Sequence, residues 1–241
     1  NPLPTPMSFY KTKNIIQAMF QQAVKNNREA VYGILCHTTR GTEKQAGTAS
    51  GFMIAPGIIA TVAHVLYRNN NEFHDLVEVI RAPDIGVNME SALPAMIDPI
   101  RDLALIRVEE PRNTKSMQLT RNIIASGTSC GSLGFPLASV TFHEDHLNVN
   151  LTERFQGGFV SAFVEEYNED SLHSWYETDS MMYSGSSGCP VFTPDGVIFG
   201  MQASTLIGED LTDGEANRLS IARLVPSTDI VRMAQFIGIR V

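Results

Sequence analysis

The first stretch of the chain carries apolar side chains at helical intervals. Apolar residues recur every three or four positions, with glutamine and lysine between them, at Ile15, Ile16, Met19, Phe20, Ala23 and Val24. Such a stripe predicts an amphipathic helix that packs one side on a neighbouring surface. Docking of a partner protein is the alternative use of the stripe. We expect Thr12 or Asn14 to cap the helix, and we assign residues 1–29 to an N-terminal helical extension.

From Ala30 onward the pattern changes to short apolar runs separated by glycine, proline, asparagine and aspartate. Five runs come before a polar, proline-bearing connector at 109–122, and five come after it. Runs this short, many of them rich in valine and isoleucine, are typical of strands in an all-β sandwich or barrel. The simplest interpretation is two small β-barrels, over 30–115 and 116–225. The predicted strands are Val31–Cys36, Gly51–Ile54, Gly57–Val62, Leu76–Ile80, Leu103–Val108, Ser129–Gly134, Gly157–Val164, Pro190–Phe192, Val197–Ala203 and Leu219–Val225.

The last residues, 226–241, return to a helical pattern. Pro226 and Ser227 are a start signal, with the Ser227 hydroxyl as the expected cap, and Gly238 is suited to end the helix. Four apolar residues form the stripe of this C-terminal helix: Ile230, Met233, Ala234 and Ile237.

Composition limits the class of partner rather than the fold. The 241 residues include 18 Lys and Arg against 26 Asp and Glu, which gives a net charge of −8. An acidic protein repels nucleic-acid phosphates and anionic lipids, so we expect neither nucleic acid nor a membrane as a partner. No apolar run approaches the roughly 18–20 residues of a membrane span, and no signal-peptide pattern is visible.

The cysteines indicate the compartment. Cys36, Cys130 and Cys189 are odd in number and widely spaced, which is a poor framework for disulfide bonds. A reducing, cytoplasmic location is the simpler interpretation. One disulfide bond with one free thiol is the alternative.

Three short stretches carry residues suited to nucleophilic catalysis. His64 follows an apolar run, Asp102 opens a predicted strand, and Ser187 lies in a turn bounded by Gly185 and Gly188. A serine hydroxyl needs a nearby base, which histidine supplies near neutral pH. The histidine in turn needs an acid that fixes its tautomer. The backbone N–H groups of Gly185 and Ser187 are the expected donors to an oxyanion.

In this order and approximate spacing, the His64, Asp102 and Ser187 stretches resemble the three signatures of the trypsin-like (chymotrypsin-fold) serine peptidases, over roughly Val31 to Val225. Within this family, the sequence most resembles the HtrA-like and glutamyl-endopeptidase-like bacterial branches. The resemblance implies two six-stranded antiparallel β-barrels and a serine endopeptidase that cleaves protein or peptide substrates through an acyl-enzyme. It implies neither a cofactor nor a metal. Asp98 is the rival acid, but the family places the acid directly before a buried strand, where Asp102 stands.

The resemblance also implies which residues line the primary specificity pocket. They lie about six positions before the nucleophile and on the strand that follows it: Met181, Met182, Gln202, Ala203 and Ser204. A methionine stands where trypsins have a carboxylate, and no histidine stands where glutamyl endopeptidases have one. We therefore expect an uncharged, medium-sized substrate side chain in this pocket.

Other functions stay open at this point. A peptidase-like module would hold a protein without cutting it until a regulatory protein partner activates it, and a Gly185 peptide flipped away from the site would be its mark. An esterase for small acyl groups would share the chemistry of the peptidase. His143 and His146, three positions apart with two acids between them, are a weaker candidate for a metal site.

Overall fold

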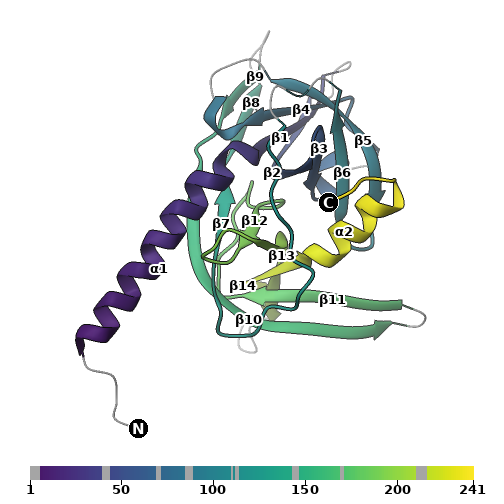
Figure 1. Ribbon diagram of the computed structural model, residues 1–241. Helices are drawn as coiled ribbons and strands as arrows, with labels where there is room; N and C mark the ends of the chain where they lie inside the picture. The colour runs from purple at the N-terminus through teal and green to yellow at the C-terminus, as the bar shows by residue number, and fades with distance from the viewer. Residues whose placement is uncertain are drawn as a thin grey trace.

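Two β-barrels, one above the other in Figure 1, form the body of the molecule. Among the described residues, no helix is both long and apolar enough to cross a membrane. The computed structural model describes residues 6–39, 44–68, 72–84, 89–109, 111, 114–142, 147–168, 171–209 and 216–241.

The first barrel consists of six antiparallel strands: β1 (Val31–Thr38), β2 (Gln45–Ala55), β3 (Ile58–Thr61), β4 (Leu76–Arg81), β5 (Glu90–Asp98) and β6 (Leu103–Val108). They close in the order β1-β2-β3-β6-β5-β4. All eight residues of β1 are buried, between β2 on one side and β4 on the other. Burial on both faces explains why residues 31–36 of this strand lack the polar positions of an alternating pattern.

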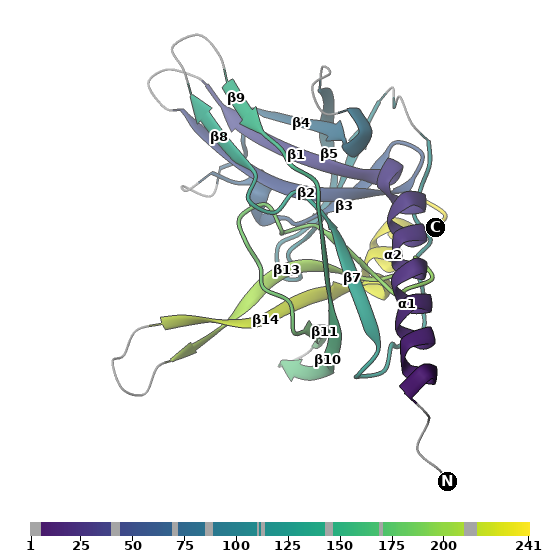
Figure 2. The ribbon, with the colours of Figure 1, turned by 90° about the vertical axis from the view of Figure 1, so that its left-hand side faces the viewer.

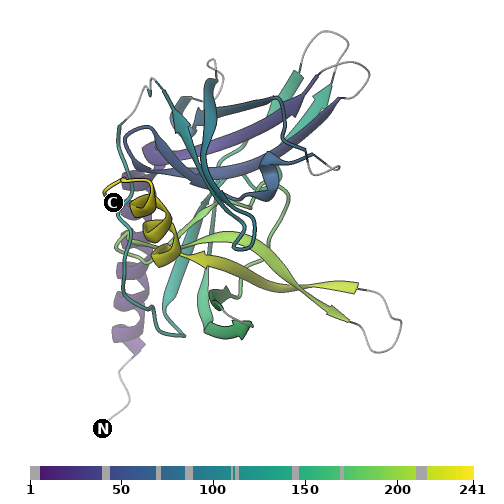
Figure 3. The ribbon, with the colours of Figure 1, turned by 90° about the vertical axis from the view of Figure 1, so that its right-hand side faces the viewer.

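The second barrel also closes with six antiparallel strands: β7 (Ser129–Gly134), β10 (Arg154–Asn168), β11 (Ser171–Thr178), β12 (Pro190–Phe192), β13 (Ile198–Glu209) and β14 (Ala216–Pro226). Their order is β10-β11-β14-β13-β12-β7. The prediction of two six-stranded antiparallel barrels is confirmed. Figures 2 and 3 show the β13–β14 hairpin extending away from the body. Among the described residues, a separate two-stranded sheet and three single helical turns complete the β part: β8 (Ser139–Phe142), β9 (Leu147–Asn150), η1 (Arg28–Ala30), η2 (His64–Leu66) and η3 (Ala82–Asp84).

One hydrophobic core crosses the junction between the barrels. The larger cluster fills the first barrel and continues into the second through Phe135, Phe192 and Met201. A smaller cluster around Tyr176 and Phe199 fills the rest of the second barrel. Because apolar packing is continuous across the junction, the facing edges of the two barrels have a fixed relative position.

The connector between β6 and β7 bonds to both barrels. The N–H of Met117 donates to Met53 in the first barrel at 2.8 Å, and the N–H of Thr120 donates to Ile198 in the second at 2.8 Å. The connector therefore runs over the surface of both barrels, which explains why its residues are largely polar.

The N-terminal helix α1 (Pro6–Asn27) lies along β7 and extends beyond the barrels at its N-terminal end (Figures 1 and 2). The Phe20 ring packs against Phe155 and Phe192, with centroid distances of 5.4 and 6.3 Å. The helix was expected, but its predicted cap is wrong. Thr12 and Asn14 lie inside the helix, because it begins at Pro6, where proline is favourable in a first turn.

The C-terminal helix α2 (Ser227–Phe236) packs against the junction of the barrels (Figure 3). The predicted cap is again wrong, because Pro226 is the residue before the first turn and Ser227 is already helical. The Ser227 hydroxyl donates instead to the Thr120 carbonyl at 2.7 Å, which joins α2 to the connector. Gly238 follows the helix with φ 77°, the left-handed conformation that was expected to end it.

Phe20 should account for much of the contact between α1 and the second barrel. We expect Phe20→Ala to lower the free energy of unfolding by about 2 kcal/mol, less than for a fully buried phenylalanine because this ring is only partly buried. Urea unfolding of the two proteins measures the difference. Ile15→Ala is the matched control on the same helix: Ile15 is 59% exposed, and its loss should cost less than about 0.5 kcal/mol. Equal losses would contradict the packing role of Phe20.

Candidate active site

His64 and Asp102 meet at the edge of the first barrel. His64 begins η2 three residues after β3 ends, and Asp102 is the last residue of the turn between β5 and β6. The imidazole Nδ1 lies 2.7 Å from one carboxylate oxygen of Asp102, and the backbone N–H of His64 donates to the other oxygen at 2.8 Å. An ionised carboxylate can only accept, so a neutral imidazole carries its proton on Nδ1 and keeps the lone pair on Nε2. That tautomer is the one a general base requires.

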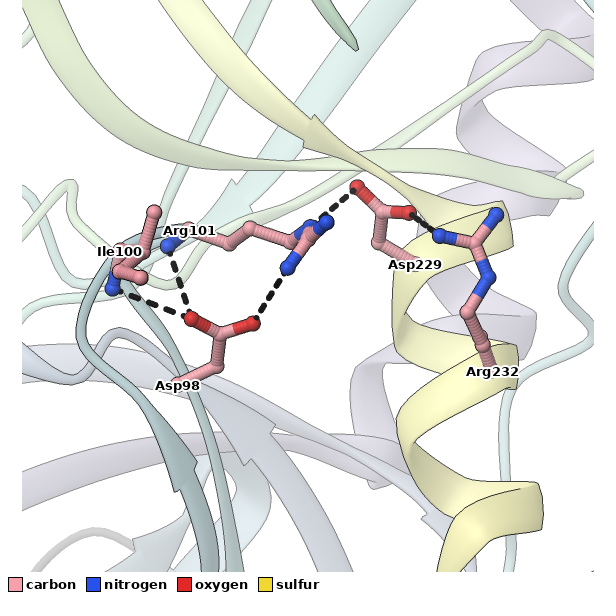
Figure 4. A network of polar contacts seen from close by, with 5 residues as sticks. All are labelled: Asp98, Ile100, Arg101, Asp229 and Arg232. Carbon is pink, nitrogen blue, oxygen red and sulfur yellow. Dashed lines mark hydrogen bonds and ion pairs between the residues drawn. The ribbon is translucent and has the colours of Figure 1, made fainter. Parts of the chain in front are cut away.

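Asp98, the rival acid, bonds within its own turn instead. Its carboxylate accepts hydrogen bonds from the backbone of Ile100 and from both the backbone and side chain of Arg101 (Figure 4). Burial opposes ionisation of Asp98, but the hydrogen bonds from Arg101 outweigh it and hold the pKa of this carboxyl below its ordinary value. The acid that contacts the histidine is therefore Asp102.

Ser187 lies in a tight turn of the second barrel, between two glycines in the left-handed region. Gly185 has φ 83° and Gly188 has φ 84°. A Cβ on Gly185 would lie 2.3 Å from the Phe135 carbonyl, and one on Gly188 would lie 1.8 Å from the Ser50 carbonyl. Both positions therefore require glycine for their φ and for the close backbone approach. The Ser187 hydroxyl is 3.5 Å from the Ala203 carbonyl oxygen.

Ser50 on β2 joins the first barrel to this turn. Its backbone N–H donates to the Ser187 carbonyl at 2.7 Å, and its hydroxyl donates to the Gly185 carbonyl at 2.8 Å. The same hydroxyl accepts the N–H of Phe135 at 2.9 Å, and the Ser50 carbonyl accepts the Thr61 hydroxyl at 2.7 Å. Ser50 is completely buried. Sequence reasoning missed this residue; the only local signal was a small polar residue among the apolar positions of a strand.

The expected oxyanion donors make no hydrogen bond within the described part of the chain. Among the described residues, the N–H groups of Gly185 and Ser187 donate to no other group. The carbonyl of Ser184, in the same peptide unit as the Gly185 N–H, accepts the N–H of Leu137 at 2.6 Å. Because a peptide is planar and trans, this bond directs the Gly185 N–H away from Leu137. No hydrogen bond within the described part of the chain therefore occupies either N–H group.

Two cavities flank the His64–Asp102 pair. One of about 330 Å³ reaches Asp102 and is bounded by β13 and β14. The other, of about 690 Å³, reaches His64 and lies between β2 and β8. Asp102 therefore borders one hollow and His64 the other, and Ser187 lines neither.

Comparison with known proteins identifies the family. The sequence pattern of the trypsin-like peptidase domain matches residues 49–201, more than half of the chain. The chain belongs to this family. The crystal structure of the active form of the Rv3671c protease from M. tuberculosis has a similar fold, with a TM-score of 0.67 and 17% identity, covering 93% of this chain and 88% of that chain. No curated protein matches the sequence.

In this trypsin-like peptidase domain, the residues predicted to line the specificity pocket have different surroundings. Ala203 and Ser204 line the 330 Å³ cavity beside Asp102. Met181 is 52% exposed, and Met182 packs against the smaller core cluster. Gln202 is buried, and its Oε1 has no hydrogen-bond partner in the described part of the chain. The pocket assignment of all five stays a prediction.

The cysteines of this peptidase domain are free and buried, so the alternative with one disulfide bond is wrong. Burial raises the pKa of the Cys189 thiol to about 12, which leaves almost no thiolate at neutral pH two residues after Ser187. Within the described ranges, no group of three or more His, Cys, Asp or Glu is placed to hold a metal. The candidate pair His143 and His146 lies outside those ranges.

Ser50 should hold both the fold and the nucleophile turn. We expect Ser50→Ala to lower the free energy of unfolding by about 1–3 kcal/mol, because the buried Phe135 N–H loses its acceptor and the Gly185 carbonyl loses its donor. Urea unfolding measures the loss, and hydrogen exchange should show faster exchange at 185–188. Ser161→Ala, at an exposed position of β10, is the matched control and should change neither. Unchanged exchange at 185–188 would contradict the assigned contact.

Asp98 should stabilise the fold in a pH-dependent way. We expect Asp98→Asn to lower the free energy of unfolding by about 1–2 kcal/mol near neutral pH, because a charge-assisted bond to Arg101 is lost. The folded-state pKa of Asp98 is lowered, so its contribution is fully present above the ordinary value of 3.8 and disappears as the pH falls through the folded-state value. Urea unfolding at decreasing pH should show variant and wild type converging. A constant difference at every pH would contradict this assignment.

Proposed function

We propose that this protein is a serine endopeptidase that hydrolyses peptide bonds in protein substrates through an acyl-enzyme. The observation that carries the proposal is the two-point contact of the Asp102 carboxylate with His64, in a chain of the trypsin-like peptidase family. The buried hydrogen bonds of Ser50, which join the first barrel to the Ser187 turn, support it.

Each of these residues has a role in the proposed reaction. Ser187 attacks the scissile carbonyl, while His64 takes the hydroxyl proton through Nε2 and later gives it to the leaving amine. Asp102 holds the Nδ1 proton and stabilises the imidazolium that forms. The N–H groups of Gly185 and Ser187 bind the oxyanion of each tetrahedral intermediate, which is where negative charge develops. Water then attacks the acyl carbonyl while His64 takes a proton from it; the ester bond to Ser187 breaks, and His64 returns the proton to the Ser187 oxygen.

The proposed substrate is an extended peptide with an uncharged, medium-sized side chain at the cleavage site. Met181, Met182, Gln202, Ala203 and Ser204 are the residues proposed to bind that side chain. The two cavities beside the His64–Asp102 pair support an extended substrate rather than a small ester. Profiling against a diverse peptide library would report the preferred side chain.

A resting form that needs a regulatory protein partner is the second candidate. The Ser187 hydroxyl makes its long contact with the Ala203 carbonyl, and this orientation favours a resting enzyme. The Gly185 N–H, which makes no hydrogen bond among the described residues, argues the other way, because a silent site of the kind considered would have that peptide flipped. We also propose a cytoplasmic location, which the three buried free thiols support.

The nucleophile can be tested by covalent labelling. We expect a fluorophosphonate probe to label the wild-type protein at Ser187, and Ser187→Ala to lose the label together with nearly all peptide cleavage. Mass spectrometry of the labelled peptide identifies the site. Ser161→Ala, which removes an exposed serine of β10, is the matched control, and this variant should be labelled like the wild type. A folded wild-type protein that takes no label would exclude a constitutively active serine peptidase.

A further inference from the structure

The turn that precedes Asp102 is fixed by its own side chains. One oxygen of Asp98 accepts the N–H groups of Ile100 and Arg101 at 3.0 and 3.1 Å, and the other accepts Nη1 of Arg101 at 2.8 Å. Figure 4 shows both oxygens occupied. The backbone is therefore held up to the residue directly before Asp102.

Arg101 also reaches the C-terminal helix. Its Nε lies 3.7 Å from one oxygen of Asp229, whose other oxygen accepts Nη1 of Arg232 at 3.0 Å (Figure 4). The Asp229 side chain, in the first turn of α2, is only 8% exposed, while that of Arg232 is 72% exposed. Arg101 is thus the residue of this network that contacts both the Asp98 turn and α2.

Stability alone does not account for this ion pair. Burial raises the pKa of Asp229, and the attraction of Arg232 and Arg101 offsets that effect only in part. The buried carboxylate is therefore less favourable in the folded protein than in water, which makes the pair a weak source of stability. We therefore look to the position of the Arg101–Asp229 pair, which fixes one side of the turn before Asp102, for its role.

We propose that Arg101 is a positioning residue for Asp102 and that, through Asp229, helix α2 sets how the Asp102 carboxylate meets His64. This inference rests on the function proposed above. Asp102 has a left-handed backbone, with φ 52°, and both of its oxygens bond to His64, so a small rotation of the turn would break both bonds. Displacements of about 1 Å at such a contact are costly to catalysis.

A direct contact between Arg101 and substrate is the competing role, because Arg101 also lines the 330 Å³ cavity. The two roles change different kinetic parameters. Loss of a substrate contact raises KM, whereas a misplaced Asp102 lowers kcat and leaves KM nearly unchanged. The conservative replacement separates them further, since arginine uses one nitrogen to hydrogen-bond Asp98 and another to pair with Asp229, and lysine has a single nitrogen.

The test uses a peptide that library profiling shows the wild-type protein to cleave. We expect Arg101→Gln to lower kcat by about tenfold or more with KM within about twofold, and Arg101→Lys to recover only part of the rate. Asp229→Asn should lower kcat by about threefold. The double variant of Arg101 and Asp229 should be no slower than Arg101→Gln, because both substitutions act through one contact.

The pH profile provides a sign test. The acid limb of kcat/KM reports protonation of the base, His64. Loss of the Arg101 charge alone would move that limb to higher pH, because a nearby cation disfavours a second one. A misplaced Asp102 moves it to lower pH, because the imidazolium loses its partner. We expect Arg101→Gln to move the limb to lower pH.

The controls separate failure of this inference from failure of the proposed function. Arg107→Gln is the matched control, an exposed arginine on β6 with no ion pair among the described residues, and should keep the wild-type kcat. A wild type that takes no fluorophosphonate label contradicts the proposed function itself. If the wild type is labelled, three results overturn this inference alone. They are an unchanged kcat in Arg101→Gln, a raised KM in Arg101→Gln, and full recovery of the rate in Arg101→Lys. If Arg101→Gln does not fold, Asp229→Asn provides the test. An unchanged kcat in Asp229→Asn would then overturn the positioning role of Arg101.

Discussion

The arrangement of this site depends on the hydrogen bonds of Ser50 to the turn that carries Ser187. A single buried residue of the first barrel uses its N–H, its carbonyl and its hydroxyl, and two of its bonds go to the carbonyls of Gly185 and Ser187. Those two bonds fix the Gly185–Ser186 and Ser187–Gly188 peptide units, whose N–H groups donate to the carbonyls of Tyr183 and Gln202. The turn can approach this closely only because Gly188 has no side chain, since a Cβ there would overlap the Ser50 carbonyl. The same hydrogen bonds of Ser50 thus fix both the relative position of the two barrels and the backbone shape of the turn that carries Ser187.

That constraint matters because the candidate site is divided between the barrels. The first supplies His64 from η2 after β3 and Asp102 from the turn before β6, and the second supplies Ser187 from the turn before β12. No local segment holds all three, so their geometry depends on how the barrels dock. The continuous core through Phe135 and Phe192 resists sliding, and the hydrogen bonds of Ser50 select one docking among the apolar alternatives.

The sequence was informative where a residue's role follows from its neighbours in the chain, and silent where it follows from distant ones. Apolar runs predicted the buried strands, but β5 and β11 were missed because their exposed and polar positions break the run. The resemblance favoured Asp102 over Asp98 because Asp102 stands directly before a buried strand, and Asp102 is the carboxylate that contacts His64. Its role as the catalytic acid stays a prediction. Ser50 and Asp229 could not be found, because each bonds to residues more than a hundred positions away.

Solvent reaches the His64–Asp102 pair, and this exposure determines which interactions can fix the orientation of the two side chains. The side chains of His64 and Asp102 are 54% and 28% exposed, so the attraction between them is screened and worth only about 1 kcal/mol by itself. An attraction that weak does not fix an imidazole within a few tenths of an ångström. Orientation must come from directional bonds and a rigid backbone: the His64 N–H on the second oxygen, and the closed turn before Asp102. In an exposed site of this kind, the residues around the turn matter as much as the pair itself.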